Sequence, residues 1–308
     1  MSDLIRRLFK RKRIIHTEPA DPGKGDRSAQ PGDTPPQKDP AERSARMEAV
    51  KTSQVIVGVG HSPGVQRDHN EDALFTLTTI LVSDTQTIPF GLYIVADGMG
   101  GHEHGEKASG VAVRAMARYV ISKLLSPLID LPPLSPEDPI QQVMQDGIQV
   151  AHRAIIRFAA GGGTTLTALL ILGDQMTIAH VGDSRAYVLP PDREIQVLTR
   201  DHSLVRRLVE LGQLTSAEAS DHPQRNVLYR ALGQGEPVDA EVITAPLPRG
   251  GFLLLCSDGL WGVIPDRTIM DIVFSSASPS QACQDLVTSA NKAGGPDNIA
   301  VILLQLPE

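Results

Sequence analysis

The sequence predicts an α+β fold in which sheets and helices form separate layers, and three observations favour it. Short runs of β-branched and apolar residues, typical of strands, recur in groups along the chain. Two long segments with helical apolar spacing interrupt these groups. Further helical segments come shortly before the last strand-like run. Grouped strands separated by grouped helices are typical of antiparallel sheets with helices on their faces.

The first half of the chain contains two expected strands and two expected helices. The β-branched run over residues 54–60 and the apolar run over 91–98 predict strands. Apolar residues at helical spacing predict helices over 105–125 and 140–159. Five prolines lie within residues 126–139, and they predict a loop between the two helices.

The second half begins with four strand-like runs over residues 164–199, separated by short turns, which predict an antiparallel meander. Residues 202–233 have the pattern of short helices and loops. The remaining expected elements are a buried strand over 251–259, helices over 266–274 and 279–293, and a last strand over 298–306.

The charge pattern divides the chain into two parts. Residues 1–52 carry 12 of the 29 Lys and Arg and 8 of the 36 Asp and Glu, a net charge of +4, and residues 53–308 therefore carry −11. The first part is rich in Pro, Gly, Ser and Gln and predicts a flexible basic tail, with one domain over residues 53–308. An acidic domain argues against nucleic acid as a partner, because phosphate backbones need a basic face.

The head of the tail, residues 1–16, alternates Leu, Ile and Phe with Arg and Lys. It suits weak contact with an anionic membrane surface or a partner, and a solvated basic tail is the alternative. It lacks the continuous apolar stretch of a secretory signal, and no run reaches the roughly 18 residues of a membrane helix. Cys256 and Cys283 are too few for a disulfide framework and are expected in the core of a cytoplasmic protein.

Acidic residues recur where apolar strands are expected to end. They are Glu71, Asp72, Asp97, Asp183, Asp258 and Asp297. A single Asp-Gly pair is a common turn, but several carboxylates at the rim of a sheet repel one another unless cations neutralise them. Mg²⁺ and Mn²⁺ prefer such oxygen ligands, so the pattern predicts a divalent-cation site. The glycines after Asp97 and Asp258 are expected to allow sharp turns, with a carbonyl as a further ligand.

Arg67 lies four residues before Glu71, where its guanidinium is suited to bidentate phosphate binding, and a surface salt bridge is the alternative. Residues 162–165 lack the Lys of a P-loop and are expected to give tight entry into a strand. Neither cysteine begins a Cys-x₅-Arg motif, and HExxH and GxSxG are missing. His102 and His104 flank Glu103, but two histidines without further zinc ligands are more often loop residues.

Eight motifs, taken in order, resemble the protein phosphatase 2C family of metal-dependent protein phosphatases in its bacterial form. They are GVQRDHNEDA (64–73), VADGMGGHEHGEKAS (95–109), GGTTLTALL (162–170), HVGDSRAYVL (180–189), LTRDHS (198–203), HPQRNVLYRALG (222–233), LLLCSDGLW (253–261) and GGPDNIAVIL (294–303). The resemblance covers residues 54–306. It implies a four-layer αββα sandwich, in which two antiparallel β-sheets face each other and helices lie outside.

The resemblance also implies the role of each site residue. Two divalent cations, Mn²⁺ or Mg²⁺, would be held by Glu71, Asp97, the Gly98 carbonyl, Asp258 and Asp297, with Asp97 bridging them. Asp72 would lie just outside the metal ligands, and Asp183 would hold a third, weaker cation. Arg67 would bind phosphate, which makes Arg67, Asp97 and Asp258 the expected catalytic residues. Residues 202–226 match the flap beside the active site.

The implied activity is hydrolysis of phosphoserine and phosphothreonine in proteins by direct attack of a water held between the two cations. The implied partners are phosphorylated proteins, among them a bacterial eukaryotic-like Ser/Thr kinase and its substrates. All catalytic groups lie in one chain, so a monomer suffices. Two positions depart from the family. Met99 stands where many eukaryotic members have a histidine proposed as general acid, and Asn226 stands where some bacterial relatives have a serine.

Three alternatives stay open at this point. A catalytically dead member would bind phosphoproteins, but such proteins usually lose metal carboxylates that this chain retains. A phosphatase dedicated to one regulator, such as an anti-sigma antagonist, normally has sensor domains, for which residues 1–52 are too short. A nucleotide or small-molecule phosphohydrolase would need a basic or aromatic pocket for its substrate, which the sequence does not indicate.

Overall fold

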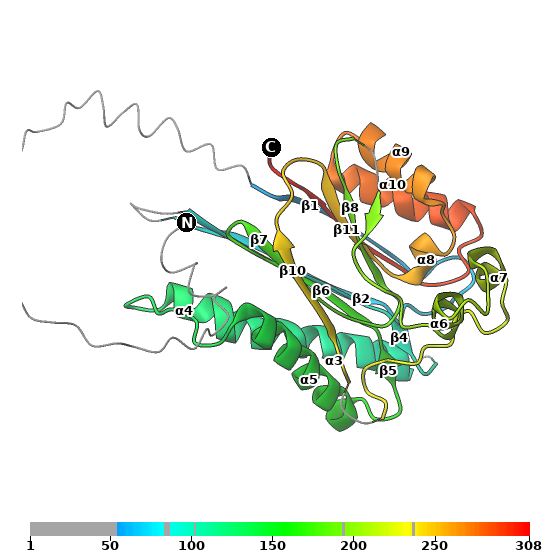
Figure 1. Cartoon of the computed structure of the whole chain (residues 1–308), viewed down its shortest axis with the longest axis horizontal. Helices are drawn as coiled ribbons and strands as arrows, with labels where there is room; N and C mark the ends of the chain where they lie inside the picture. The colour runs from blue at the N-terminus through cyan, green and yellow to red at the C-terminus, as the bar shows by residue number, and fades with distance from the viewer. Residues whose placement is uncertain (1–53, 83–86, 102, 193–194, 236–237) are drawn as a thin grey trace, which may run out of the picture. The chain divides into compact units, whose positions relative to one another are not determined.

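The computed structural model describes residues 54–82, 87–101, 103–192, 195–235 and 238–308. The tail predicted over residues 1–52 lies outside them, and so does His102. Two antiparallel five-stranded sheets face each other, and helices cover both outer faces (Figure 1). The predicted four-layer αββα sandwich is therefore confirmed. Within the described residues, no helix has the length and apolarity that crossing a bilayer requires.

One sheet has the strand order β10-β7-β6-β3-β2. Its strands are β2 (Ala73–Val82), β3 (Thr87–Ala96), β6 (Leu166–Leu172), β7 (Gln175–Val181) and β10 (Glu241–Pro246). The helices α3 (Glu103–Val120) and α5 (Ile140–Phe158) cover its outer face, where Met116 and Ile148 are fully buried (Figure 1). The central strand β6 is apolar along almost its whole length because both of its faces are covered.

The other sheet has the strand order β1-β12-β11-β8-β9. Its strands are β1 (Ile56–Ser62), β8 (Arg185–Leu189), β9 (Gln196–Val197), β11 (Phe252–Cys256) and β12 (Ile299–Gln305). The helices α9 (Asp266–Ser275) and α10 (Pro279–Lys292) cover its outer face. Cys256 and Cys283 are free and buried in this layer, as predicted. Tyr93 and Ile302 belong to the aliphatic core between the two sheets.

The shorter elements lie around the end of the sandwich that carries the candidate site. They are β4 (Gly98–Met99), β5 (Gly163–Thr164), α6 (Leu204–Glu210), α7 (Ser216–Ser220) and α8 (Asp258–Trp261). The helices α6 and α7 belong to the flap, residues 202–226. Side-chain caps fix where both begin, because Ser203 accepts a hydrogen bond from the Arg206 amide and Thr215 forms a capping box with Glu218.

The predicted meander over residues 164–199 is wrong in its topology. The strands β6 and β7 pair within one sheet, whereas β8 and β9 pair within the other. The chain crosses between sheets at Gly182, whose φ of +110° is a conformation that L side chains rarely adopt. A Cβ at this position would also lie 2.5 Å from the Thr165 side chain. Apolar runs on either side of the crossing look alike, so the sequence pattern does not reveal the change of sheet.

Several element boundaries also differ from the predictions. The loop predicted over 126–139 begins helically, because a π-helical turn, η1 (Ile121–Leu125), leads from α3 into α4 (Ser126–Ile129). The strand predicted over 251–259 ends at Cys256. His104 lies in α3 rather than in a loop. The edge strands β2 and β10 were not predicted, because their side chains are only partly buried and their apolar pattern is mixed.

Candidate metal and phosphate site

The two sheets bring the six predicted carboxylates to one end of the sandwich. Asp97, Asp183 and Asp258 each follow a strand. Glu71, Asp72 and Asp297 precede strands, so the prediction that each acidic residue closes a strand is wrong for these three. Both groups reach the same edge because antiparallel neighbours begin where their partners end. The pairing of Ala73 with Ala96, beside Asp72 and Asp97, is one such case.

Burial and neighbouring carboxylates raise the pKa values of three of these carboxyl groups. Burial, followed by the charges of Asp72 and Asp258, raises the pKa of Asp97 well above its ordinary value. Burial raises the pKa of Asp72 to about 8, and the charges of Asp258 and Asp297 add to it, although a hydrogen bond from Ser257 acts in the opposite direction. Burial and the charge of Asp297 raise the pKa of Asp258 to about 6. Divalent cations would stabilise the charged form of this cluster.

Asp183 lies beside this cluster. Burial, followed by the charges of Asp258 and Asp201, raises its pKa well above the ordinary value. The indole Nε1 of Trp261 donates a hydrogen bond to its carbonyl oxygen at 3.0 Å. The backbone of Asp183 is therefore fixed at the crossing between the two sheets, and its carboxyl group is close enough to Asp258 and Asp201 for their charges to raise its pKa.

The donor set fits hydrated divalent cations. It consists of carboxylate oxygens, and Oδ1 of Asp72 is buried without a hydrogen-bond partner in the described part of the chain. Asp97 and Asp258 keep part of their surface exposed, so an ion can reach them. No group of three His, Cys, Asp or Glu side chains among the described residues is arranged to hold an ion. Mg²⁺-like ions retain several waters when bound, so carboxylates that do not form a closed protein cage can still hold them.

The backbone of Asp97 is held by the segment 162–165. The Asp97 amide donates to Oγ1 of Thr165 at 2.9 Å, and the Asp97 carbonyl accepts from Oγ1 of Thr164 at 2.8 Å and from the Thr165 amide at 2.9 Å. Oγ1 of Thr165 also lies 2.7 Å from Oγ of Ser184, next to Asp183. The predicted entry into a strand is therefore present, and its threonines additionally fix Asp97.

Gly98 and Gly259 are glycines for a different reason from the one predicted. Neither has a positive φ, so neither makes a sharp left-handed turn. A Cβ on Gly98 would lie 2.3 Å from the Gly105 carbonyl oxygen, and one on Gly259 would lie 2.0 Å from the Asn298 carbonyl oxygen. Both positions need glycine because another segment passes directly against the backbone.

Glu71 and Arg67 come from the loop between β1 and β2. The carbonyl of Glu71 accepts hydrogen bonds from the Gly98 amide at 3.2 Å and from Oγ of Ser109 at 2.6 Å. Nη2 of Arg67 donates to Oδ2 of Asp297 at 2.9 Å. The side chain of Arg67 is 51% exposed, so its guanidinium can contact a ligand as well as Asp297. The predicted phosphate-binding arginine thus lies directly beside a predicted metal ligand.

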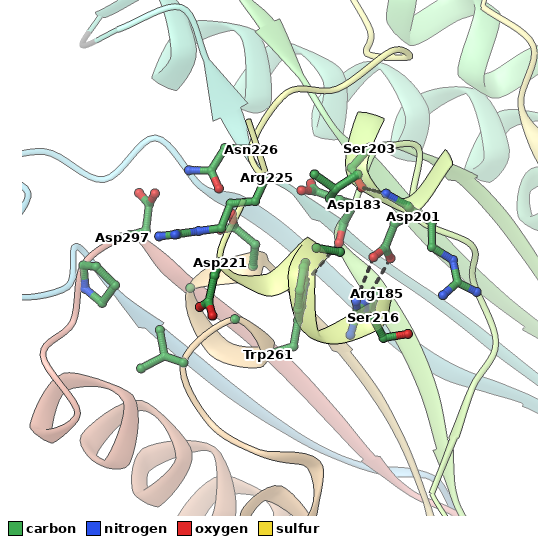
Figure 2. A pocket seen from close by; sticks show the side chains of 18 of the residues that line it. Asp183, Arg185, Asp201, Ser203, Ser216, Asp221, Arg225, Asn226, Trp261 and Asp297 are labelled. Atoms are coloured by element: carbon green, nitrogen blue, oxygen red, sulfur yellow. Dashed lines mark hydrogen bonds and ion pairs between the residues drawn. The ribbon is translucent and has the colours of Figure 1, made fainter. Parts of the chain in front are cut away.

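A cavity of about 800 Å³ adjoins the carboxylates under the flap. Arg67, Asp183, Asp258 and Asp297 line it from the sandwich, and Ser203, Arg206, Asp221, Arg225 and Asn226 line it from the flap. In Figure 2, Arg225 and Asn226 lie on the side of Asp297, and Asp201 faces Arg185. Arg185 donates two hydrogen bonds to Asp201, at 2.9 and 2.7 Å, and its guanidinium lies 3.5 Å from the centre of the Trp261 ring. This bidentate pair fixes the residue directly before the flap against the sandwich.

Four side chains that hold the site in place were not predicted. They are Thr165, Arg185, Ser257 and Asn298. Each stands inside a motif that was recognised, but nothing in the residue type alone indicates a bond to a segment distant in sequence. Oγ of Ser257, for example, donates to Oδ2 of Asp72 at 2.7 Å across 185 positions of the chain.

Comparisons with known proteins agree on one family. The family model described as Protein phosphatase 2C matches residues 59–300. The serine/threonine phosphatase stp of Listeria welshimeri is 37% identical over 247 residues, which are 78% of this chain and 91% of that protein. A serine/threonine phosphatase of S. agalactiae aligns with a TM-score of 0.67 and 32% identity over 82% of this chain and 99% of its own. The catalytic domain of the phosphatase PstP, solved with two manganese ions, aligns with a TM-score of 0.65 and 28% identity over 83% and 99%.

Proposed function

Because the chain belongs to the protein phosphatase 2C family and is a metal-dependent phosphoprotein phosphatase, we propose that it hydrolyses phosphoserine and phosphothreonine with two divalent cations at the acidic end of the sandwich. The observation that carries the proposal is the group of Asp72, Asp97 and Asp258, whose pKa values are all raised by burial and by neighbouring carboxylates. The group adjoins a cavity that Arg67 also lines.

The cations, when bound, activate a water for in-line attack on phosphorus and offset the charge of the phosphoryl oxygens. Asp97, Asp258 and Asp297 would hold the first ion, and Asp97 with Glu71 and the Gly98 carbonyl would hold the second. The raised pKa values of Asp97 and Asp258 support this assignment, since both carboxyl groups need a positive neighbour to ionise at neutral pH. The PstP structure with two manganese ions supports the number.

Arg67 is assigned to bind the phosphoryl group. Its guanidinium is half exposed, lines the cavity and already contacts a carboxylate oxygen, which has the charge and geometry of a phosphate oxygen. Asp72 is assigned a supporting role, because its Oδ1 is buried without a partner and can accept a hydrogen bond from a water in the metal site. Met99 has no proton to donate, so no side chain is assigned as general acid.

Asp183 is assigned to a third, weaker cation. It lines the same cavity as Asp258, and the charge of Asp258 contributes to its raised pKa. The positive charge of Arg185 lowers the pKa of Asp183 in part and offsets some of its charge, which is consistent with weaker cation binding. Asn226, also in the cavity wall, supplies an amide oxygen but no charge.

The proposed substrates are phosphorylated proteins, among them a Ser/Thr kinase and its targets, and the catalytic domain spans residues 53–308. A wide cavity with charged side chains of both signs suits a peptide segment around a phosphoresidue better than a small ligand. Turnover of a phosphothreonine peptide should be compared with turnover of a nucleoside monophosphate, in Mn²⁺ and in EDTA. Preference for the peptide, lost in EDTA, supports the proposal, and preference for the nucleotide contradicts it.

A further inference from the structure

Asn298 connects two loops that carry the principal site residues. Its Oδ1 accepts a hydrogen bond from the Glu71 amide at 2.7 Å. Its Nδ2 donates to the carbonyl oxygens of Pro63 at 2.9 Å and of His69 at 2.8 Å. Both polar atoms of this amide are thus bonded to the loop that carries Arg67, and the residue is 94% buried, with 6% of its surface exposed.

The backbone of Asn298 is fixed on the other side of the site. Its amide donates to Oδ1 of Asp297 at 2.9 Å, while Oδ2 of the same carboxylate accepts from Arg67. Its carbonyl passes so close to Gly259, the neighbour of Asp258, that no Cβ fits there. Asn298 therefore contacts the segments that carry Glu71, Asp258 and Asp297. Its three side-chain hydrogen bonds lie on both sides of Arg67 along the chain.

Other hydrogen bonds join the same pair of loops. One comes from an exposed side chain, because Nε2 of Gln66 donates to the Gly294 carbonyl at 3.2 Å, and two others are between backbone atoms. The amides of Val65 and Gln66 donate to the Gly295 carbonyl, at 2.8 and 3.1 Å. These bonds involve backbone atoms, so they form with almost any side chain. Asn298, in contrast, is buried, and its side chain bonds to the loop on both sides of Arg67, at Pro63 and at His69 and Glu71.

We propose that Asn298 is a positioning residue that sets the spacing between the phosphate-binding Arg67 and the metal carboxylates Glu71 and Asp297. The inference rests on the proposed function, since it assumes that Arg67 binds phosphate. One phosphoryl group must contact Arg67 and the cations together, and misplacement by about 1 Å reduces such joint binding strongly. The buried side-chain amide of Asn298 meets this requirement, because all of its hydrogen bonds go to the loop that carries Arg67 and Glu71.

The chemistry of the position requires an amide. Asparagine alone offers one acceptor for the Glu71 amide and two donors for two carbonyls at this length. Aspartate has the same shape, but its carboxylate would face the carbonyl oxygens of Pro63 and His69 without a donor. Asn298→Asp therefore removes the hydrogen bonds to these two carbonyls, which constrain the loop that carries Arg67, with little change in side-chain volume.

The test measures inhibition by inorganic phosphate, Mn²⁺ binding by calorimetry and thermal stability in Asn298→Asp, Arg67→Ala and the double variant. Gln149→Ala is the matched control. The side chain of Gln149 also donates a hydrogen bond to a backbone carbonyl, that of Val238, but Gln149 lies on the helix α5, which covers the other sheet. If Asn298→Asp does not fold, Asn298→Ser replaces it, since serine leaves no buried charge.

The proposal predicts that Asn298→Asp weakens phosphate binding about tenfold and also weakens Mn²⁺ binding. In the Arg67→Ala background it should weaken phosphate binding less than about twofold, because the positioned group is already gone. Loss of stability alone, with phosphate and Mn²⁺ binding as in Gln149→Ala, overturns the proposal. If the double variant weakens phosphate binding by the product of the two single-variant factors, the proposal is overturned as well. If Arg67→Ala leaves phosphate affinity unchanged, the assignment of Arg67 itself fails.

Discussion

Nη2 of Arg67 donates a hydrogen bond to Oδ2 of Asp297 at 2.9 Å, which joins the proposed phosphate-binding residue to a proposed metal ligand. The two side chains come from positions 230 residues apart, in loops that precede β2 and β12. A cation at Asp297 and the guanidinium of Arg67 compete for the same carboxylate. Metal binding should therefore release Arg67 toward the cavity, where a phosphoryl group can contact it.

Replacing Arg67 by alanine should separate phosphate binding from metal binding. Phosphate inhibition should weaken roughly tenfold or more, because a hydrogen bond to a charged group is lost. Mn²⁺ affinity should stay equal or rise up to about fivefold, since a half-exposed competing ion pair contributes at most about 1 kcal/mol. Calorimetric Mn²⁺ titration and phosphate inhibition measure the two effects. Clearly weaker Mn²⁺ binding would contradict the proposed competition. Arg157→Ala, at an exposed helix end, serves as control.

Asp183→Asn should leave the two tight cations in place and raise the Mn²⁺ concentration needed for half-maximal turnover. The charge of Asp183 adds to the raised pKa of Asp97, and the charge of Asp258 adds to that of Asp183. Asp183 is not assigned as a ligand of the two tight cations. The Mn²⁺ dependence of phosphopeptide hydrolysis is the measurement. An unchanged metal requirement would refute the assignment of a third ion to this residue.

Thr165→Val should lower both stability and turnover. The change removes the acceptor of the Asp97 amide and the partner of Ser184, at a loss of about 1–3 kcal/mol in the free energy of unfolding. Urea denaturation and kcat measure the effects. Thr177→Val is the control, because the Thr177 hydroxyl is hydrogen-bonded to Thr244 in its own sheet, away from the site. Equal loss of kcat in both variants would argue against a specific role for Thr165.

Without metal, the protein should become less stable as pH rises from about 6.5 to about 8. The folded state raises the pKa of Asp72 from 3.8 to about 8, so it holds a proton that the unfolded chain has lost. Stability from such a group falls as pH rises through the folded pKa. His180 and His202, whose pKa values are lowered to about 3 and about 4, act in the opposite direction, but only below about 6.5.

The melting temperature in EDTA, measured across this pH range, tests that prediction. Asp72→Asn should show a smaller decline, because the asparagine does not titrate. Saturating Mn²⁺ should also reduce the decline, because the ions stabilise the ionised carboxyl groups. A melting temperature that is constant or rises with pH in EDTA would show that burial and the neighbouring carboxylates do not raise the pKa of Asp72 as the structure indicates.

Much of the fold was predictable because its strands and helices have distinct apolar periods. The sheet-to-sheet crossing at Gly182 was not predictable from that pattern, since β7 and β8 are both apolar strands and only their pairing differs. The edge strand β2 was missed because its alternating threonines and aliphatic residues are only partly buried. Periodicity reports burial, and these two features depend on which strand lies next to which.

The site was predictable to the extent that its residues are charged. Repeated acidic residues near strand ends indicated a cation site, and the structure brings them to one end of the sandwich. Neutral residues such as Asn298 and Thr165 act through hydrogen bonds between segments distant in sequence, so residue type alone did not reveal them. Arg67 forms a partly exposed salt bridge with Asp297, which is the alternative that the sequence offered beside phosphate binding, but the sequence did not identify the partner.

The most direct test of the account is hydrolysis of a phosphothreonine peptide by the wild type and by Asp258→Ala, with and without Mn²⁺. Two-cation catalysis predicts turnover by the wild type only with the metal, and turnover reduced at least about a hundredfold in a variant that still folds. Wild-type protein that is folded and saturated with Mn²⁺, yet hydrolyses no peptide, would contradict the proposed two-cation mechanism. It would favour a family member that binds phosphoproteins without turning them over.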